Sequence, residues 1–216
     1  KLDCIAITDH FTDSWKEWVT TLKNIDVITD YLNEISYCQE FLKANNKRLI
    51  VLKGVEIDLS STERFIKRNI QPFRFDIILF EYLQSIEGIA FIKNLINFWK
   101  RTSTKVKGLP IFGLAHFDPS YFIHGNLIQL VKFMKEYNIY FEFNPSYPSF
   151  YSPQNKMFFK KLRENIVPVG IGCDSHSIIN LNNIEDPLGM IIYYDLEDNF
   201  QILLNSLRNN FQNFIQ

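Results

Sequence analysis

Polar side chains that can bind a metal ion follow six successive apolar stretches of this sequence. In chain order they are Asp9 with His10, Glu56, Glu81, His116, Asn144, and Asp174 with His176. Imidazole and carboxylate groups together suit Zn²⁺, Fe²⁺ or Mn²⁺, whereas an all-oxygen set would favour Mg²⁺ or Ca²⁺. If the apolar stretches are parallel strands, their carboxyl ends meet at one edge of the sheet, where sites are built. The pattern therefore predicts a metal site made by residues that lie far apart in the sequence.

The segment Gly170–His176 is the strongest single signal. Its small residues let the backbone and ligands approach closely, and Asp174 and His176, two residues apart, point the same way from an extended segment. The other positions each have a structural alternative. Asp9 can cap a helix, Glu56 can form a buried salt bridge, and His116 can be an ordinary residue before a turn. The six positions together favour a site.

Strands and helices alternate in the predicted secondary structure. Apolar runs rich in β-branched residues predict strands at Leu2–Thr8, Leu49–Ile57, Asp76–Phe80, Ile111–Ala115, Ile139–Phe143 and Val167–Cys173. Helical periodicity predicts helices at about Asp13–Asn45, Ile86–Thr102, Leu127–Tyr137, Pro153–Glu164 and Asn199–Phe214, the first capped by Asp13 or Ser14. Strands that are apolar throughout and are followed by helices indicate a parallel α/β sheet buried on both faces. Periodicity leaves open whether that sheet is doubly wound or a closed barrel.

Several short motifs resemble those of the PHP (polymerase and histidinol phosphatase) superfamily. The run Cys4–His10 resembles its strand that ends in Thr-Asp-His, and Gly54-Val55-Glu56 is similar to its Gly-x-Glu strand. Ala115–Pro119 resembles its His-Pro type motif, Phe141–Asn144 its Glu-x-Asn strand, and Gly172–His176 its terminal Asp-x-His motif. The order and spacing agree up to about residue 190. The resemblance implies a distorted (β/α)7 TIM-like barrel that holds two or three divalent metal ions (Zn, Mn or Fe).

The same resemblance implies a role for each matching residue. Glu56 would bridge two ions, Asp174 would bind the first ion, His116 the second, and His10 and His176 the third. Glu81 stands where the family usually has a histidine and would serve as a ligand in its place. Asp9 or His176 would carry a proton to the leaving group. No segment matches the His-x-His strand with which the family begins, so we expect residues 1–216 to be a single PHP domain whose first strand is absent from this chain.

The chemistry that follows from such a site is hydrolysis of phosphate esters by metal-activated water. We expect a phosphoric monoester hydrolase that acts on a small phosphorylated substrate, similar to histidinol phosphatase. Two alternatives remain: a PHP-type nuclease or phosphodiesterase, and a non-catalytic PHP-like binding or scaffold subunit. A barrel-type amidohydrolase fits less well, because Glu56 takes the place of the lysine that usually bridges its metals.

The composition limits which binding partners and which cellular compartment we expect. The 23 Lys and Arg against 24 Asp and Glu give a net charge of −1 and no overall basic excess, so nucleic acid is an unfavoured partner. Arg64, Lys67 and Arg68 are explained equally well by phosphate recognition and by a solvated helix face. No apolar run is long enough to span a bilayer, and the three cysteines, with Cys4 and Cys173 expected to be buried, indicate a cytoplasmic protein.

Overall fold

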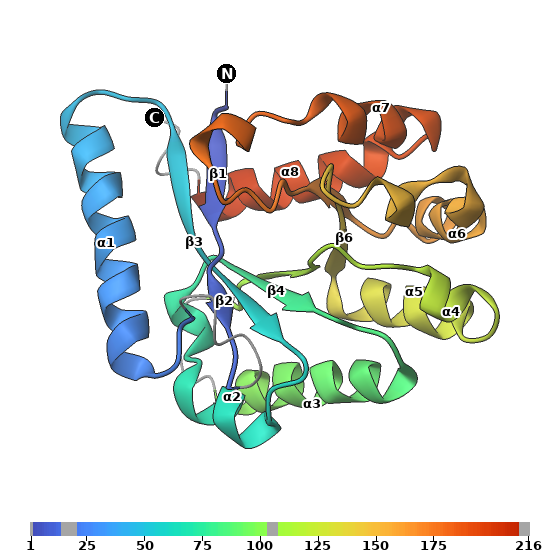
Figure 1. Cartoon of the computed structure of the whole chain (residues 1–216), viewed down its shortest axis with the longest axis horizontal. Helices are drawn as coiled ribbons and strands as arrows, with labels where there is room; N and C mark the ends of the chain where they lie inside the picture. Colours follow the sequence, from blue (N-terminus) through green and yellow to red (C-terminus); the bar gives the residue numbers. More distant parts are fainter. Residues whose placement is uncertain (1, 14–20, 103–107, 212–216) are drawn as a thin grey trace. The chain divides into compact units, whose positions relative to one another are not determined.

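Strands and helices alternate along the chain in the computed structural model, which describes residues 2–13, 21–102 and 108–211 (Figure 1). The strands are β1 (Cys4–Ile7), β2 (His10–Phe11), β3 (Ile50–Asp58), β4 (Ile77–Glu81), β5 (Ile111–Leu114), β6 (Ile139–Phe143) and β7 (Val169–Ile171). The α-helices are α1 (Ile25–Ala44), α2 (Glu63–Asn69), α3 (Ile86–Thr102), α4 (Ser120–Ile123), α5 (Leu127–Tyr137), α6 (Lys156–Asn165), α7 (Glu185–Tyr193) and α8 (Glu197–Phe211). Short 3-10 helices lie at η1 (Pro72–Arg74), η2 (Pro148–Tyr151), η3 (Pro153–Asn155) and η4 (Ile178–Asn180).

The chain divides into two compact units, which we describe separately. Unit 1 is Lys1–Tyr82 and Phe91–Ile111 with Ile215, and unit 2 is Leu83–Ala90 and Phe112–Phe214 with Gln216. The assignment of residues 1–216 to a single domain stays a prediction.

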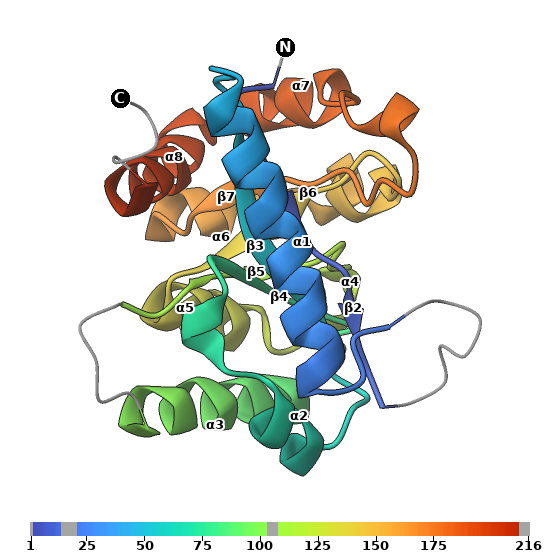
Figure 2. The same cartoon turned by 90° about the vertical axis from the view of Figure 1, so that its left-hand side faces the viewer.

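Unit 1 is built on the long central strand β3. It pairs in parallel with β4 and, on its other edge, with β1 and β2. Cys4 lies opposite Ile50 and His10 lies opposite Glu56, so β1 and β2 keep one register along β3. Helix α1 packs against β3, as Figure 2 shows.

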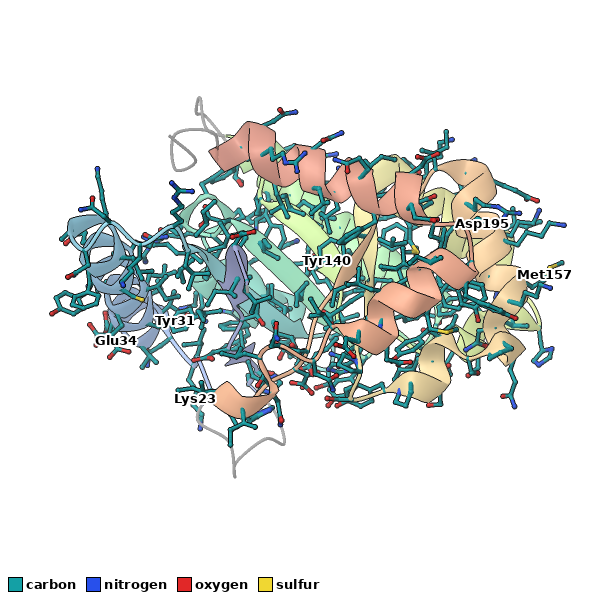
Figure 3. All side chains as sticks on the ribbon, turned by 90° about the horizontal axis from the view of Figure 1, so that it is seen from above. Lys23, Tyr31, Glu34, Tyr140, Met157 and Asp195 are labelled. Atoms are coloured by element: carbon teal, nitrogen blue, oxygen red, sulfur yellow. The ribbon has the colours of Figure 1, made fainter. Side chains whose placement is uncertain are left out.

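A tyrosine hydroxyl lies at the break between β1 and β2. The Tyr31 hydroxyl group, on the sheet side of α1 (Figure 3), lies 2.8 Å from the carbonyl oxygen of Ile7 and 2.9 Å from that of Gly54. It accepts a hydrogen bond from the backbone N–H of Asp9 at 3.3 Å. A Cβ atom on Gly54 would lie 2.5 Å from the Thr8 methyl group, so glycine is needed for the close approach of the two strands here.

Unit 2 carries three parallel strands in the order β5, β6, β7. Phe141 and Phe143 on β6 are fully buried and contact the rings of Phe158 and Phe159 on α6. This aromatic cluster fixes α6 over the strands, because large rings in edge and stacked contact remove much apolar area from water.

The structure confirms the predicted α/β class with parallel strands. The bounds of β6, α3 and α5 are those predicted from periodicity. The predicted long first helix begins at Ile25 in the described residues, and its N-cap is Asn24, whose side chain accepts from the backbone N–H of Val27 at 3.0 Å. Residues 14–20, and with them the predicted cap Ser14, lie outside the described residues.

Several features differ from the prediction. Helices α2, α4 and α7 were not predicted, because short helices carry too few turns to show an apolar period. Strand β7 is shorter than the predicted Val167–Cys173. The expectation of buried cysteines is wrong for Cys4, which is exposed at the start of β1, and Cys173 is half-buried. Among the described residues, no helix is both long and apolar enough to cross a membrane.

Candidate functional site: polar residues at the strand ends

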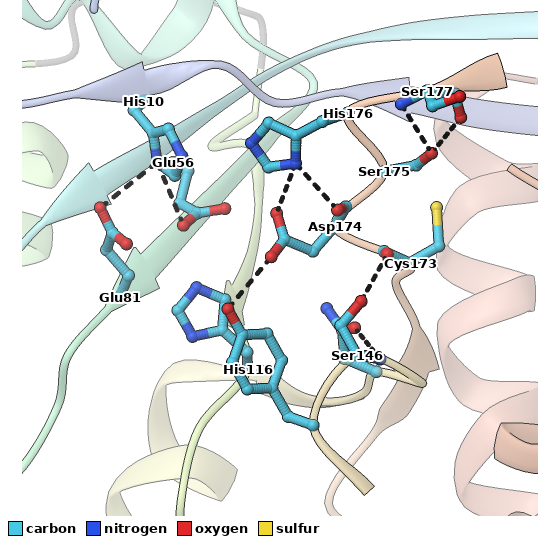
Figure 4. Close-up of polar contacts among 12 residues, drawn as sticks. His10, Glu56, Glu81, His116, Ser146, Cys173, Asp174, Ser175, His176 and Ser177 are labelled. Carbon is cyan, nitrogen blue, oxygen red and sulfur yellow. Dashed lines mark hydrogen bonds and ion pairs between the residues drawn. The ribbon is translucent and has the colours of Figure 1, made fainter. Parts of the chain in front are cut away.

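Three of the predicted metal ligands meet in unit 1, at the carboxyl ends of β2, β3 and β4. The Nδ1 atom of His10 lies 3.4 Å from Oε1 of Glu56 and 3.5 Å from Oε1 of Glu81 (Figure 4). One possible ligand atom from each residue falls within 4.8 Å of the other two. These three side chains could therefore hold one metal ion.

The strand register explains why the three side chains converge. His10 is the direct neighbour of Glu56, and Glu81 lies opposite Asp58, two residues along β3. Side chains two residues apart on a strand share a face, so all of these groups point to the same side of the sheet. Glu56 is 5% exposed and Glu81 is 0% exposed, so two carboxylates are buried within reach of a single imidazole.

Burial of two carboxylates requires a compensating positive charge. Hydrogen bonds to Glu56 and then to Glu81 raise the pKa of His10 from 6.5 to about 10, although partial burial acts in the opposite direction. A protonated imidazole supplies one positive charge beside these two carboxylates. A bound metal ion would take its place, because a histidine ligand must be deprotonated.

A second polar group lies on the same face, next to this cluster. Asp58 is fully buried, and its carboxylate accepts hydrogen bonds from the hydroxyl of Thr12 at 3.3 Å and from the backbone N–H of Ser60 at 2.8 Å. The sequence Glu56-Ile57-Asp58 could have predicted that Asp58 lies beside Glu56, because every second residue of a strand points to the same face. Asp9, predicted to carry a proton, is exposed, and its carbonyl oxygen accepts from the backbone N–H of Glu56 at 3.1 Å.

The remaining predicted residues belong to unit 2 and form a hydrogen-bonded group there. The Tyr147 hydroxyl donates to Oδ2 of Asp174 at 3.2 Å, and the Tyr147 ring stacks on His116 with centroids 4.7 Å apart. His116 has a φ of 31° and Asp174 a φ of 43°, a conformation that is uncommon outside glycine. Glu142, a residue outside the predicted set, accepts from the backbone N–H of His116 at 3.3 Å and from the Asn144 amide at 2.9 Å.

His176 lies at the edge of this group. Its side chain is 70% exposed, and its Nδ1 atom lies 3.8 Å from Oδ1 of Asp174 and 3.1 Å from the carbonyl oxygen of the same residue. Within the described residues, the compact three-residue groups of potential ligands are limited to His10, Glu56 and Glu81. The structure thus brings three of the six predicted ligands into one cluster and links His116 to Asp174 through Tyr147.

The fold is similar to that of a chain in a solved ribonuclease P. That structure is a cryo-EM structure of archaeal ribonuclease P with mature tRNA, and the likeness has a TM-score of 0.55 at 14% sequence identity. It covers 98% of this chain and 85% of the other. No family model matches the chain, and no curated protein matches it.

These comparisons correct the predicted family and reaction. The assignment to the PHP superfamily is wrong, and so is the expected phosphoric monoester hydrolase, because the matching fold belongs to a ribonuclease P assembly and not to a phosphatase. The motifs misled for a physical reason. Polar residues gather at the carboxyl ends of parallel strands in α/β proteins of many functions, so Thr-Asp-His or Asp-x-His at such an end indicates the fold and not the reaction.

The predicted partners are corrected by the same finding. We expected a small phosphorylated substrate and disfavoured nucleic acid, whereas the similar chain lies in an assembly solved with tRNA. The error came from the use of net charge for the whole chain. An average of −1 says nothing about how the 23 basic residues are distributed over the fold.

Proposed function

We propose that this chain is a protein component of an RNA-processing ribonucleoprotein and that it binds RNA of the tRNA type. The observation that carries the proposal is the fold likeness over 98% of this chain to a chain of an archaeal ribonuclease P solved with mature tRNA. The proposed role is that of a binding subunit, which is the scaffold alternative reached from the sequence, now with RNA as its partner. It requires no hydrolysis by the strand-end residues.

The uneven distribution of charge supports an RNA partner. Unit 1 contains 16 Lys and Arg against 13 Asp and Glu, a net charge of +3, and unit 2 contains 7 against 11, a net charge of −4. Three acids of unit 1, Glu56, Asp58 and Glu81, are buried and contribute little to its surface. The surface of unit 1 is therefore more positive than its net charge, as binding to a phosphate backbone requires.

The cluster of His10, Glu56 and Glu81 fits this proposal as a site for a divalent ion. One imidazole nitrogen with carboxylate oxygens suits Zn²⁺, Mn²⁺ or Fe²⁺. Such an ion would tie together the ends of β2, β3 and β4, and the three protein ligands would leave at least one coordination position for water. The larger number of two or three ions would need His116, Asp174 and His176 as well. That number stays a prediction, as do the (β/α)7 barrel and the cytoplasmic location.

RNA binding by the purified full chain tests the proposed function. Fluorescence anisotropy with a labelled precursor tRNA, at about 50 mM and about 200 mM salt, should show binding that weakens as salt rises, because phosphate contacts release counterions. An unstructured RNA of the same length is the control and should bind more weakly. Ultraviolet cross-linking of the tagged chain in its native cells should enrich tRNA sequences. Absence of binding to either RNA at the lower salt would overturn the proposal.

A further inference from the structure

Helix α2 and the part of α3 that belongs to unit 1, from Phe91 on, carry more basic than acidic residues. Helix α2 carries Arg64, Lys67 and Arg68 against one acid, Glu63. The part of unit 1 from Phe91 to Ile111 contains five Lys and Arg and no Asp or Glu. Three of those five, Lys93, Lys100 and Arg101, lie on α3, whose first turn also carries one acid, Glu87. The ratio of basic to acidic residues in these two segments is higher than the ratio in unit 1 as a whole, which is 16 to 13.

The two helices are neighbours. The Nζ atom of Lys67 lies 4.7 Å from the centroid of the Phe98 ring, so α2 contacts α3 directly. Figures 1 and 2 both draw the two helices side by side. The single acid of α2, Glu63, pairs with Lys67 one turn away, so its charge is neutralised within the helix. The pair leaves the positive charges of Arg64 and Arg68 on α2.

Three arginines of this helix pair are exposed, two on α2 and one on α3. Arg64 and Arg68 are exposed and lie four residues apart, which places them on one face of α2 about one turn from each other. Arg101 is exposed in the last turn of α3, where its Nε donates to the carbonyl oxygen of Asn97 at 3.2 Å. The guanidinium keeps further N–H groups beyond that bond, since it carries five.

The side-chain chemistry favours phosphate over the carboxylates of an acidic protein. A guanidinium group binds a phosphate through two parallel N–H···O bonds, stays charged at all physiological pH values and loses little hydration on contact. Phosphates repeat at regular spacing along a nucleic acid, so arginines one helical turn apart can be used at the same time. An isolated acidic side chain of a protein offers no such repeat.

We propose that Arg64, Arg68 and Arg101 form a phosphate-binding surface through which α2 and α3 contact the backbone of a structured RNA. This inference rests on the proposed function, since it names the part of the molecule that binds the RNA. It goes beyond that function because it assigns the electrostatic contact with the RNA backbone to unit 1 and not to unit 2.

A charge-matched pair of triple variants tests the surface. The first carries Arg64→Gln, Arg68→Gln and Arg101→Gln. The control carries Lys132→Gln, Lys135→Gln and Lys156→Gln, which remove three exposed positive charges from α5 and α6 of unit 2. Both variants lower the net charge by the same amount, so a general charge effect would act on them equally. Circular dichroism and thermal unfolding establish that each is folded.

The readout is the salt dependence of precursor tRNA binding by the full chain. Each lost phosphate contact reduces the magnitude of the negative slope of log K against log salt by about 0.7 to 0.9. The slope of the first variant should therefore be shallower by about 2 to 3, and the variant should bind roughly 10- to 100-fold more weakly near 0.1 M salt. The control should keep the wild-type slope.

Each other outcome has a defined meaning. Wild-type chain that fails to bind RNA contradicts the proposed function and this surface with it. Wild-type binding with an unchanged slope in the first variant overturns the surface alone. The surface is also refuted if both variants lose the same affinity for RNA. It is refuted as well if the first variant keeps the wild-type affinity for RNA but no longer binds an acidic peptide, because the arginines would then recognise carboxylates.

Discussion

The hydroxyl group of Tyr31 lies between two parallel strands of unit 1 and hydrogen-bonds to both of them. It is within 2.8 Å of the Ile7 carbonyl oxygen and 2.9 Å of the Gly54 carbonyl oxygen, and it accepts from the N–H of Asp9. Burial raises the pKa of this tyrosine well above its usual value, so the hydroxyl stays protonated and can donate. The substitution Tyr31→Phe removes these contacts and keeps the ring.

The expected cost follows from the burial of the groups that lose a partner. The hydroxyl has one proton, so it donates to one carbonyl oxygen at a time, and the variant loses about one donated and one accepted bond. A buried polar group that loses its hydrogen bond costs about 1 to 3 kcal/mol. We therefore expect the free energy of unfolding to fall by about 1 to 3 kcal/mol.

The same change should weaken metal binding. Asp9 directly precedes His10, and the Tyr31 hydroxyl holds the backbone where the chain enters β2. Loss of a group that orients a metal ligand typically lowers affinity by about 10- to 100-fold. Tyr31 would thus be a positioning residue, because it acts on the cluster only through the backbone of Asp9.

Urea unfolding and calorimetric titration with Zn²⁺ or Mn²⁺ measure the two effects separately. The control is Tyr37→Phe, which makes the same chemical change on the same helix at a side chain that is 72% exposed. If Tyr31→Phe matches Tyr37→Phe to within about 0.5 kcal/mol in stability, the hydrogen bonds contribute nothing beyond a surface substitution. If stability falls and metal affinity does not, the positioning role is refuted and a structural role remains.

Further predictions concern the strand ends of both units. The substitution Glu81→Gln should lower affinity for Zn²⁺ or Mn²⁺ by about 100-fold or more, as measured by calorimetry, because a buried anionic ligand is replaced by a neutral amide. In chain treated with EDTA, the raised pKa of His10 stabilises the fold fully below pH 6.5, and this contribution is lost as pH rises towards about 10, so urea midpoints should fall more steeply over that range than those of His10→Gln. The substitution Gly172→Ala would place a Cβ atom 2.2 Å from the Glu142 carboxyl group and should lower the melting temperature by several degrees, whereas Gly125→Ala, with open space around it, should not. Equal melting temperatures for the two alanine variants would contradict the packing of Glu142.

The strands could be predicted from the sequence because their residues are apolar throughout and are bounded by turns. Strand β6 is the clearest case, since Ile139–Phe143 follows Asn138, which ends α5 with a φ of 51°, in the left-handed region that asparagine tolerates. Strand β2 could not be predicted, because two residues show no period. Helix α2 is seven residues long and its cap, Thr62, is a weak signal without an apolar stripe behind it.

The candidate metal cluster was accessible to sequence reasoning only in part. Glu56 and Glu81 end apolar runs, and a carboxylate in that place must be compensated. Their meeting with His10 depends on register, which the strand pattern does not specify before the partners are known. Tyr31 was missed because it is separated by 24 residues from the strand that it contacts and has the appearance of an ordinary core residue of an amphipathic helix.

The sequence did not predict the function of the chain correctly, and the distribution of charge explains why. The buried carboxylates of Glu56 and Glu81 attract a cation, and the exposed arginines of α2 attract an anion. Helix α2 begins at Glu63, five residues after β3 ends at Asp58, so both features follow from the same strand. A phosphatase uses acidic ligands to hold a metal ion and basic side chains to bind the phosphate of its substrate. An RNA-binding subunit can use the same acidic groups to hold a structural ion and the same basic groups to bind the RNA backbone. Motifs record which charges are present, whereas only the partner distinguishes between the two functions.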